Sequence, residues 1–140
     1  MFDFLSGIHN KNLNYECDCD RQIIKMVNDY SEYKNRFGVD AIMVGRAAIG
    51  NPWIFQQIKD AFYGRESVIP GYEERVRTVI EQLEIAAEMK GERRAVCEMR
   101  SQYAGYFKGL YNFKPVRMNL MNATTIEECK AILRTYHTDI

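Results

Sequence analysis

Apolar residues recur every three or four positions through the second half of the chain, which is the spacing of amphipathic helices. Gly91 ends the first of these periodic segments, and Pro115 lies near the start of the third, where proline suits a first helical turn. Thr125 and Glu128 match a capping box and predict the start of the last helix. Four helices of this kind can pack as a small bundle. The pattern predicts helices over residues 72–90, 92–109, 114–122 and 125–137.

The first half of the chain has a different pattern. Residues 1–37 are polar and only weakly periodic, with one predicted helix over residues 20–33. Residues 39–44 form a short, nearly continuous apolar run, which is typical of a parallel strand buried on both faces. Pro52 suits the first turn of a helix over residues 53–62. The strand and this helix together predict one βα unit.

Basic residues are concentrated in one part of the chain, although the whole sequence balances 19 basic residues against 19 acidic ones. Between Met89 and Met118 the acidic residues are Glu92 and Glu98 alone. This basic zone can contact an RNA backbone, and a solvated charged face is the alternative reading. Its basic residues are Lys90, Arg93, Arg94, Arg100, Lys108, Lys114 and Arg117.

The spacing of these residues sharpens the prediction for the second helix. Arg93, Arg100 and Lys108 are seven and eight positions apart, so a continuous helix over residues 92–109 would carry them on broadly one side. Tyr103 and Tyr106 fall on the apolar stripe of the same helix, so we expect them in the core and not as base-stacking residues.

The four cysteines lack the paired spacing of a structural zinc site, and we expect reduced thiols. Cys17 and Cys19, with His9 nearby, leave a metal site as a minor alternative. No signal peptide opens the sequence and no apolar run reaches the length of a membrane span, so we expect a cytosolic protein that does not bind membranes.

The run from Gly38 to Phe55, which reads GVDAIMVGRAAIGNPWIF, is similar to the eighth barrel strand and following loop of tRNA-dihydrouridine synthases. The chain also resembles the helical domain of that family, at Met99-Arg100, Tyr106–Leu110, Arg117 and Asn122–Thr125. The resemblance implies a mainly α fold, in which a four-helix domain follows the last βα unit of a (β/α)₈ TIM barrel. The implied parts are a divergent segment at 1–37, the βα unit at 38–63 and a tRNA-binding domain at 72–140.

The resemblance also implies chemistry. The family passes hydride from NADPH to FMN and then to a tRNA uridine, with a cysteine in an Asn-x-x-Cys-Pro motif as the acid. Backbone N–H groups and arginine at a strand-to-helix turn suit a phosphate, so Gly45 and Arg46 are the implied FMN contacts. The alternative for this chain is a turn that merely needs glycine, with Arg46 in solvent. No Cys-Pro occurs in this chain, so we expect no catalysis by it alone. Predicted tRNA contacts are Arg93, Arg94, Arg100, Lys108, Lys114 and Arg117.

Three functions remain open from sequence. The chain is part of an oxidoreductase, a non-catalytic RNA-binding or interaction module, or a fragment that folds without activity. Ser101 and Gln102 replace the family's usual Lys-His, and Gly105 replaces a usual aromatic residue, which weakens the expectation of RNA affinity. The apolar residues of the βα unit lack partner strands, which predicts self-association, a rearranged first segment or exposed apolar patches. They are Ile42, Val44, Trp53 and Phe55.

Overall fold

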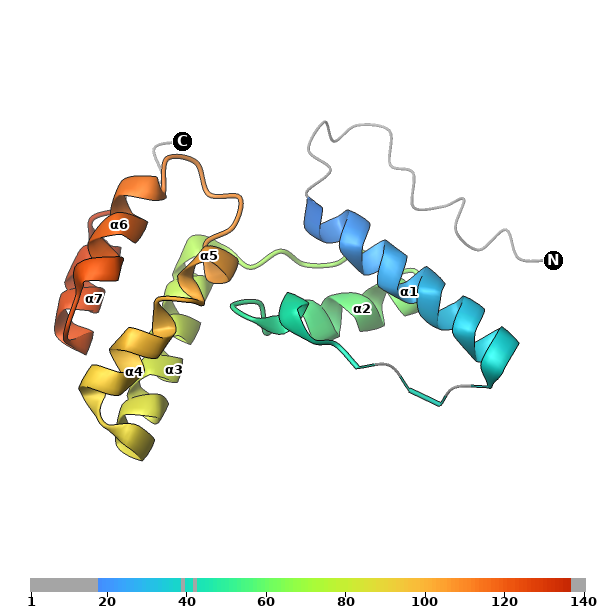
Figure 1. Ribbon diagram of the computed structural model, residues 1–140. Coiled ribbons are helices and arrows are strands. Elements are labelled where there is room, and N and C mark those ends of the chain that lie inside the picture. Colours follow the sequence, from blue (N-terminus) through green and yellow to red (C-terminus); the bar gives the residue numbers. More distant parts are fainter. Residues whose placement is uncertain (1–17, 39, 42, 137–140) are drawn as a thin grey trace. The chain divides into compact units, whose positions relative to one another are not determined.

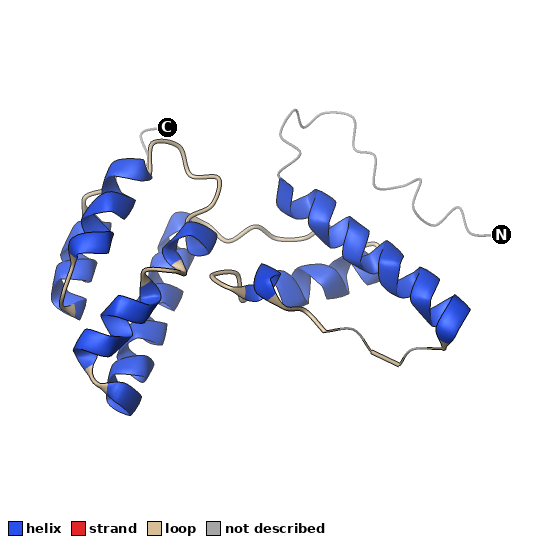
Figure 2. Ribbon diagram, viewed as in Figure 1, coloured by secondary structure: helices blue, strands red, loops and turns tan. Residues whose placement is uncertain are grey.

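The computed structural model describes residues 18–38, 40–41 and 43–136, which fall into two compact units, Met1–Ile69 and Pro70–Ile140 (Figure 1). We call them the first and the second unit. Within the described residues every regular element is a helix (Figure 2), so the expectation of a mainly α protein is confirmed.

The first unit contains a helix pair. Helix α1 (Asp18–Phe37) packs against α2 (Ile54–Phe62), and the short 3₁₀ helix η1 (Arg46–Ala48) precedes α2. The predicted helix over residues 20–33 is confirmed as part of the longer α1, and the helix predicted over residues 53–62 is confirmed as α2. The small core of the first unit is formed by Val27, Ile54 and Ile58. Partly buried apolar residues pack against this core, namely Val44, Ala47, Ala48 and Ala61.

The predicted strand over residues 39–44 is not seen. Asp40, Ala41, Met43 and Val44 have no regular structure, and the other two residues of the run lie outside the described part of the chain. A strand is stabilised by hydrogen bonds to neighbouring strands, and the described residues offer no second strand. Val44 packs instead against the core of the helix pair, while Met43 is 94% exposed.

The described part of the second unit, residues 70–136, contains five helices. Helix α3 packs against α4 and α7, and α6 packs against α7. Gly91, at φ 86°, ends α3 and starts α4, a backbone conformation that glycine adopts without strain. The predictions for α3 and α6 match both bounds. The helices are α3 (Tyr72–Lys90), α4 (Glu92–Met99), α5 (Tyr103–Tyr106), α6 (Lys114–Asn122) and α7 (Ile126–Arg134).

The core of the second unit draws on all five helices. Its members recur at the three- and four-residue spacing that the sequence shows. Full burial of one Leu or Val side chain contributes about 1.5–3 kcal/mol to the stability of the fold. Tyr103 and Tyr106 are both buried, which confirms their assignment to the core. The most deeply buried side chains are Val79, Leu83, Val96, Tyr103, Leu120, Cys129 and Leu133.

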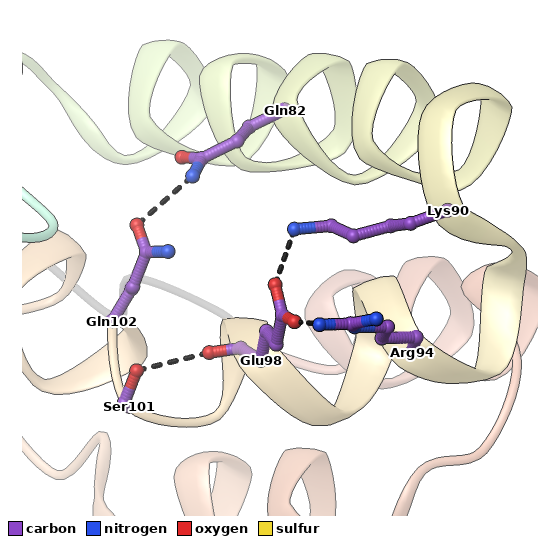
Figure 3. Close-up of polar contacts among 6 residues, drawn as sticks. All are labelled: Gln82, Lys90, Arg94, Glu98, Ser101 and Gln102. Atoms are coloured by element: carbon purple, nitrogen blue, oxygen red, sulfur yellow. Dashed lines mark hydrogen bonds and ion pairs between the residues drawn. The ribbon is translucent and has the colours of Figure 1, made fainter.

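The helix predicted over residues 92–109 is wrong as a single element. The α-helix stops after Met99, residues 100–102 form a turn in which the Gln102 N–H donates to the Met99 carbonyl at 2.8 Å, and helix resumes for the one turn of α5. Ser101 Oγ donates to the carbonyl of Glu98 at 2.9 Å, and Gln82 Nε2 of α3 donates to Gln102 Oε1 at 2.9 Å (Figure 3). These contacts hold the interruption in place.

Helix α7 begins at the predicted capping box. Thr125 Oγ1 accepts from the Glu128 N–H at 3.2 Å, and the Glu128 carboxylate accepts from the Thr125 N–H at 3.3 Å. The Thr124 N–H and hydroxyl also donate to that carboxylate, at 2.7 and 3.0 Å. These bonds, led by the one from the Thr124 backbone, lower the pKa of Glu128. The helix ends at Arg134, three residues short of the predicted end, and residue 137 lies outside the described part.

An aromatic cluster of Tyr72, Phe107, Phe113 and Tyr136 joins the start of α3 to the α5–α6 loop and the end of α7. The rings of Phe107 and Phe113 stack with centroids 4.4 Å apart, and those of Tyr72 and Tyr136 lie 4.7 Å apart. The Tyr72 hydroxyl donates to the carbonyl of Leu133 at 2.5 Å. The cluster therefore fixes the α5–α6 loop on the body of the unit.

Candidate nucleic-acid interface

The turn between α3 and α4 carries the first group of predicted cations. Glu98 accepts from Lys90 Nζ and, at 2.9 Å, from Arg94 Nε (Figure 3). Its hydrogen bonds to Lys90 and Arg94 lower the pKa of the Glu98 carboxyl. One carboxylate thus offsets the charge of two cations, and Arg94 is less available to a phosphate than the sequence suggests.

Arg93 is the exposed cation at this turn that forms no ion pair within the described residues. A shallow hollow of about 530 Å³ lies beside it, lined by Lys90, Gly91, Glu92, Arg93, Arg94 and Cys97. Glu92 faces the neighbouring helix as well, because its Oε1 accepts from the Ile126 N–H at 2.8 Å. The hollow is therefore lined by three basic side chains and by one carboxylate that already accepts from the next helix.

Arg100 points into the unit and not outward with Arg93. Its Nη2 donates to the carbonyl of Ala123 at 3.0 Å, and the side chain is half-buried. Ala123 directly follows α6, in extended backbone. Arg100 therefore occupies a structural position within the second unit.

A second group of predicted cations lies at the α5–α6 loop and the first turns of α6. Lys108 and Lys114 are exposed and Arg117 is half-buried, and none forms an ion pair within the part of the chain that the structure describes. The first turn of α6 contains no acidic residue, and no side chain caps it. Cations here add to the positive end of the helix dipole, so this helix start attracts anions.

The six predicted RNA contacts therefore do not form one face. Of these cations only Arg93 and Arg94 lie on α4, which ends at Met99, so the prediction that Arg93, Arg100 and Lys108 share one side of a continuous helix is wrong. Figure 1 shows the α3–α4 turn and the α5–α6 loop at opposite ends of the second unit. Arg93 and Arg94 lie at one end, and Lys108, Lys114 and Arg117 at the other.

Sequence reasoning missed Arg75, which holds the second group in place. Its Nε donates to the carbonyl of Pro70 at 2.9 Å, and its Nη1 donates to the carbonyls of Tyr106 and Lys108 at 3.2 and 2.9 Å. The partners of these last two bonds are more than thirty residues away along the chain. The sequence near Arg75 contains no pattern that predicts these distant bonds. The one available signal is an arginine at a helical position close to the apolar face.

The turn of Gly45 and Arg46 leads into η1 in the first unit. The Gly45 carbonyl accepts from the Ala48 N–H at 3.0 Å, and both residues are exposed. A Cβ added at Gly45 would meet no atom within 4 Å, so nothing in this structure approaches the glycine closely. A cavity of about 410 Å³ in the unit is lined by other residues, including Tyr30, Lys34 and Lys59. The described residues do not enclose a flavin.

Cys97 is exposed and Cys129 is buried beside Tyr103, whose hydroxyl lies 3.4 Å from Sγ. The predicted minor alternative at Cys17 lies outside the described residues, and the structure describes no group of three metal-ligating side chains among the residues it covers. None of the helices in the described ranges combines the length and apolar composition of a membrane crossing.

In its described part the second unit is a small helical module with two groups of cations at its surface. The chain matches the family model of the dihydrouridine synthases (Dus) over residues 23–140, and it belongs to that family.

Its relatives include the probable tRNA-dihydrouridine synthase of Aquifex aeolicus (strain VF5), which is 32% identical over 95 residues, 68% of this chain and 28% of that protein. The probable tRNA-dihydrouridine synthase of Rickettsia conorii is 36% identical over 94 residues, 65% of this chain and 28% of that protein. The tRNA-dihydrouridine synthase B of Pasteurella multocida is 27% identical over 103 residues, 72% of this chain and 29% of that protein. The chain thus matches less than a third of the length of these relatives.

Proposed function

We propose that the second unit docks tRNA for the reaction of a tRNA-dihydrouridine synthase, the reduction of uridine to dihydrouridine by NADPH through FMN. Membership in the family and the names of the relatives support the choice of tRNA and of oxidoreductase chemistry. The chain holds no Cys-Pro, so the proposed role is substrate positioning and not proton transfer.

The basic group at the α5–α6 end carries the proposal. Lys108, Lys114 and Arg117 have no acidic partner among the described residues, and the N-terminus of α6 adds positive potential of its own. Stability alone favours acidic residues in a first helical turn, so cations there suit an anionic ligand better than they suit the helix. Arg93 is the second proposed contact, at the other end of the unit, with Arg94 and Arg100 in lesser roles.

Titration of fluorescent tRNA with the chain at two salt concentrations tests this function. We expect salt-sensitive binding, since each phosphate contact releases counterions. The double variant Lys108→Ala/Lys114→Ala should weaken binding and reduce the salt slope by about two, one for each phosphate contact. Arg77→Ala, which removes an exposed cation of α3 outside both groups, is the matched control and should leave the slope unchanged. Equal slopes for the double variant and the unsubstituted chain would contradict the proposal.

A flavin absorbance scan of the same sample separates the enzyme reading from the alternative of a non-catalytic RNA-binding or interaction module. The open, exposed turn at Gly45 and Arg46 favours the module, because neither residue faces an enclosed cavity. Colourless protein that binds tRNA supports the module. Flavin that copurifies, and is lost in Arg46→Ala, supports the FMN contact implied by the family.

A further inference from the structure

Tyr111 is the most exposed aromatic side chain of the second unit's described residues, at 90% of its full accessibility. It lies in the loop between α5 and α6, next to the basic group of Lys108, Lys114 and Arg117. Its ring contacts no other aromatic ring or cation within the described part of the chain. The other strongly exposed tyrosine, Tyr63 of the first unit, is 65% exposed and lies under the guanidinium of Arg65 at 4.9 Å.

The backbone around Tyr111 is fixed although its ring is free. The Tyr136 hydroxyl donates to the carbonyl of Tyr111 at 2.7 Å, and Arg75 Nη1 donates to the carbonyl of Lys108 at 2.9 Å. Phe107 and Phe113, on either side of the loop, stack on one another at 4.4 Å. The chain therefore holds an apolar ring in water on a rigid support.

The exposed Tyr111 ring keeps apolar area in contact with water, and burial of that area by a ligand would be favourable. Asn112, which follows Tyr111, has a φ of 50°, a left-handed conformation that asparagine adopts more readily than most residues and that suits this turn.

The charges nearest to Tyr111 in the sequence indicate what covers its ring. Lys108 and Lys114, three positions before and after Tyr111, are exposed and unpaired with any acid among the described residues, so they favour a polyanion at this loop. An exposed aromatic ring in a basic loop suits single-stranded nucleic acid, because a base can stack on the ring while phosphates contact the lysines. A protein partner with an apolar surface would leave both lysines without anions.

We propose that Tyr111 stacks on an unpaired base of the bound RNA, while Lys108 and Lys114 contact the phosphates on either side. This inference rests on the proposed docking of tRNA and adds a residue to that site that distinguishes unpaired from paired nucleotides. The bond from Tyr136 reaches the main chain of residue 111, so substitution of the ring leaves the support of the loop in place.

The experiment compares the unsubstituted chain with Tyr111→Ala and Tyr111→Trp in binding to tRNA, to an oligouridine and to a blunt RNA duplex. Loss of one stacking contact should weaken binding of tRNA and oligouridine by Tyr111→Ala by about 5- to 150-fold, with the salt slope unchanged because no charge is removed. Tyr111→Trp should retain binding. Duplex binding should change little in either variant. Tyr63→Ala is the control for loss of an exposed tyrosine.

The outcomes separate the two proposals. If Tyr111→Ala binds every RNA as the unsubstituted chain does, while Lys108→Ala/Lys114→Ala is weakened, tRNA docking stands and the stacking role is wrong. If the unsubstituted chain binds no RNA, both proposals are wrong, and the exposed ring points to a protein partner. An unchanged thermal unfolding midpoint for Tyr111→Ala would show that its effect on binding is not a loss of folding.

Discussion

Arg100 joins two helix ends that are distant in the sequence. It follows the last residue of α4, and its Nη2 donates to the carbonyl of Ala123 at the end of α6. Ala123 follows α6 in extended backbone, and the charged guanidinium is a strong donor to its carbonyl. Because the contact is half-buried, we expect Arg100 to contribute to folding more than to RNA affinity.

Arg100→Ala should lower the free energy of unfolding by about 1.5–3 kcal/mol, the usual contribution of a hydrogen bond to a charged group. Arg93→Ala removes an exposed cation without an ion pair and should change the free energy of unfolding by less than about 0.5 kcal/mol. Urea unfolding followed by far-UV circular dichroism measures both. Equal stability of the two variants would show that the Ala123 contact contributes little.

Arg93 and Arg100 also show that the sequence predicts which residues are buried but not where a long polar side chain points. The sequence placed both in one basic zone, and Tyr103 correctly in the core, because burial follows apolar periodicity. The direction of a long polar side chain depends on which carbonyl or carboxylate lies nearby in space. Glu98 and Ala123, and not the spacing of the cations, decide where Arg94 and Arg100 point.

Helix α7 shows an element whose start is encoded locally. Thr125 and Glu128 satisfy each other's backbone N–H groups, and the lowered pKa of Glu128 reflects the donors around its carboxylate. All the participants lie within five residues of one another. Such a motif is readable from sequence because it needs no distant partner.

Thr125→Ala should lower the free energy of unfolding of the second unit by about 1 kcal/mol, since it leaves the Glu128 N–H without its acceptor. Thr125→Ser keeps the hydroxyl and should retain most of that stability. Thermal unfolding of the two variants beside the unsubstituted chain tests the difference. A similar loss for alanine and serine would attribute the effect to the methyl group and not to the cap.

The segment from α4 to α5 shows the opposite case. Met99, Tyr103 and Tyr106 continue the helical spacing across the break, so the sequence predicts one helix where the structure has two. Gln102 bonds to Gln82 of α3, and Ser101 bonds back to the carbonyl of Glu98. Periodicity records which side chains are buried, and it does not record whether the chain turns between them.

At the scale of the whole second unit, its tyrosines link folding to pH. Burial, followed by the charges of Glu73 and Tyr136, raises the pKa of Tyr72 from 10.0 to about 12. Burial likewise raises the pKa of Tyr103 and of Tyr106. In the folded state these hydroxyls keep their protons at pH values where the unfolded chain loses them. The contribution of these tyrosines to the free energy of unfolding is therefore fully present below about pH 10, and it decreases as the pH rises further.

We expect alkaline unfolding of the second unit, with loss of helical circular dichroism alongside the rise of tyrosinate absorbance. Tyr72→Phe should make the decrease in stability between about pH 10 and 12 shallower, because one linked proton is removed. Tyr63→Phe, at an exposed site outside the second unit, is the control. A pH dependence that Tyr72→Phe leaves unchanged would mean that Tyr72 does not contribute.

The first unit leaves apolar side chains in water, among them Phe55 at 57% and Ile49 at 52% exposure. The sequence predicts self-association, a rearranged first segment or exposed patches for a βα unit without partner strands. Of the residues named for this prediction, Phe55 is exposed, whereas Val44 packs against the helix pair and Trp53 is half-buried, and self-association stays a prediction.

The sequence by itself determined the helices α3, α6 and α7, the capping box, the core stripe and membership in the dihydrouridine synthase family. Each of these depends on residues within a few turns of one another or on a contiguous motif. The tertiary structure decided the break after Met99, the inward direction of Arg100 and the separation of the cations into two groups. It also decided the absence of a strand in the described part of residues 39–44, since strand formation requires a neighbour that local sequence cannot supply.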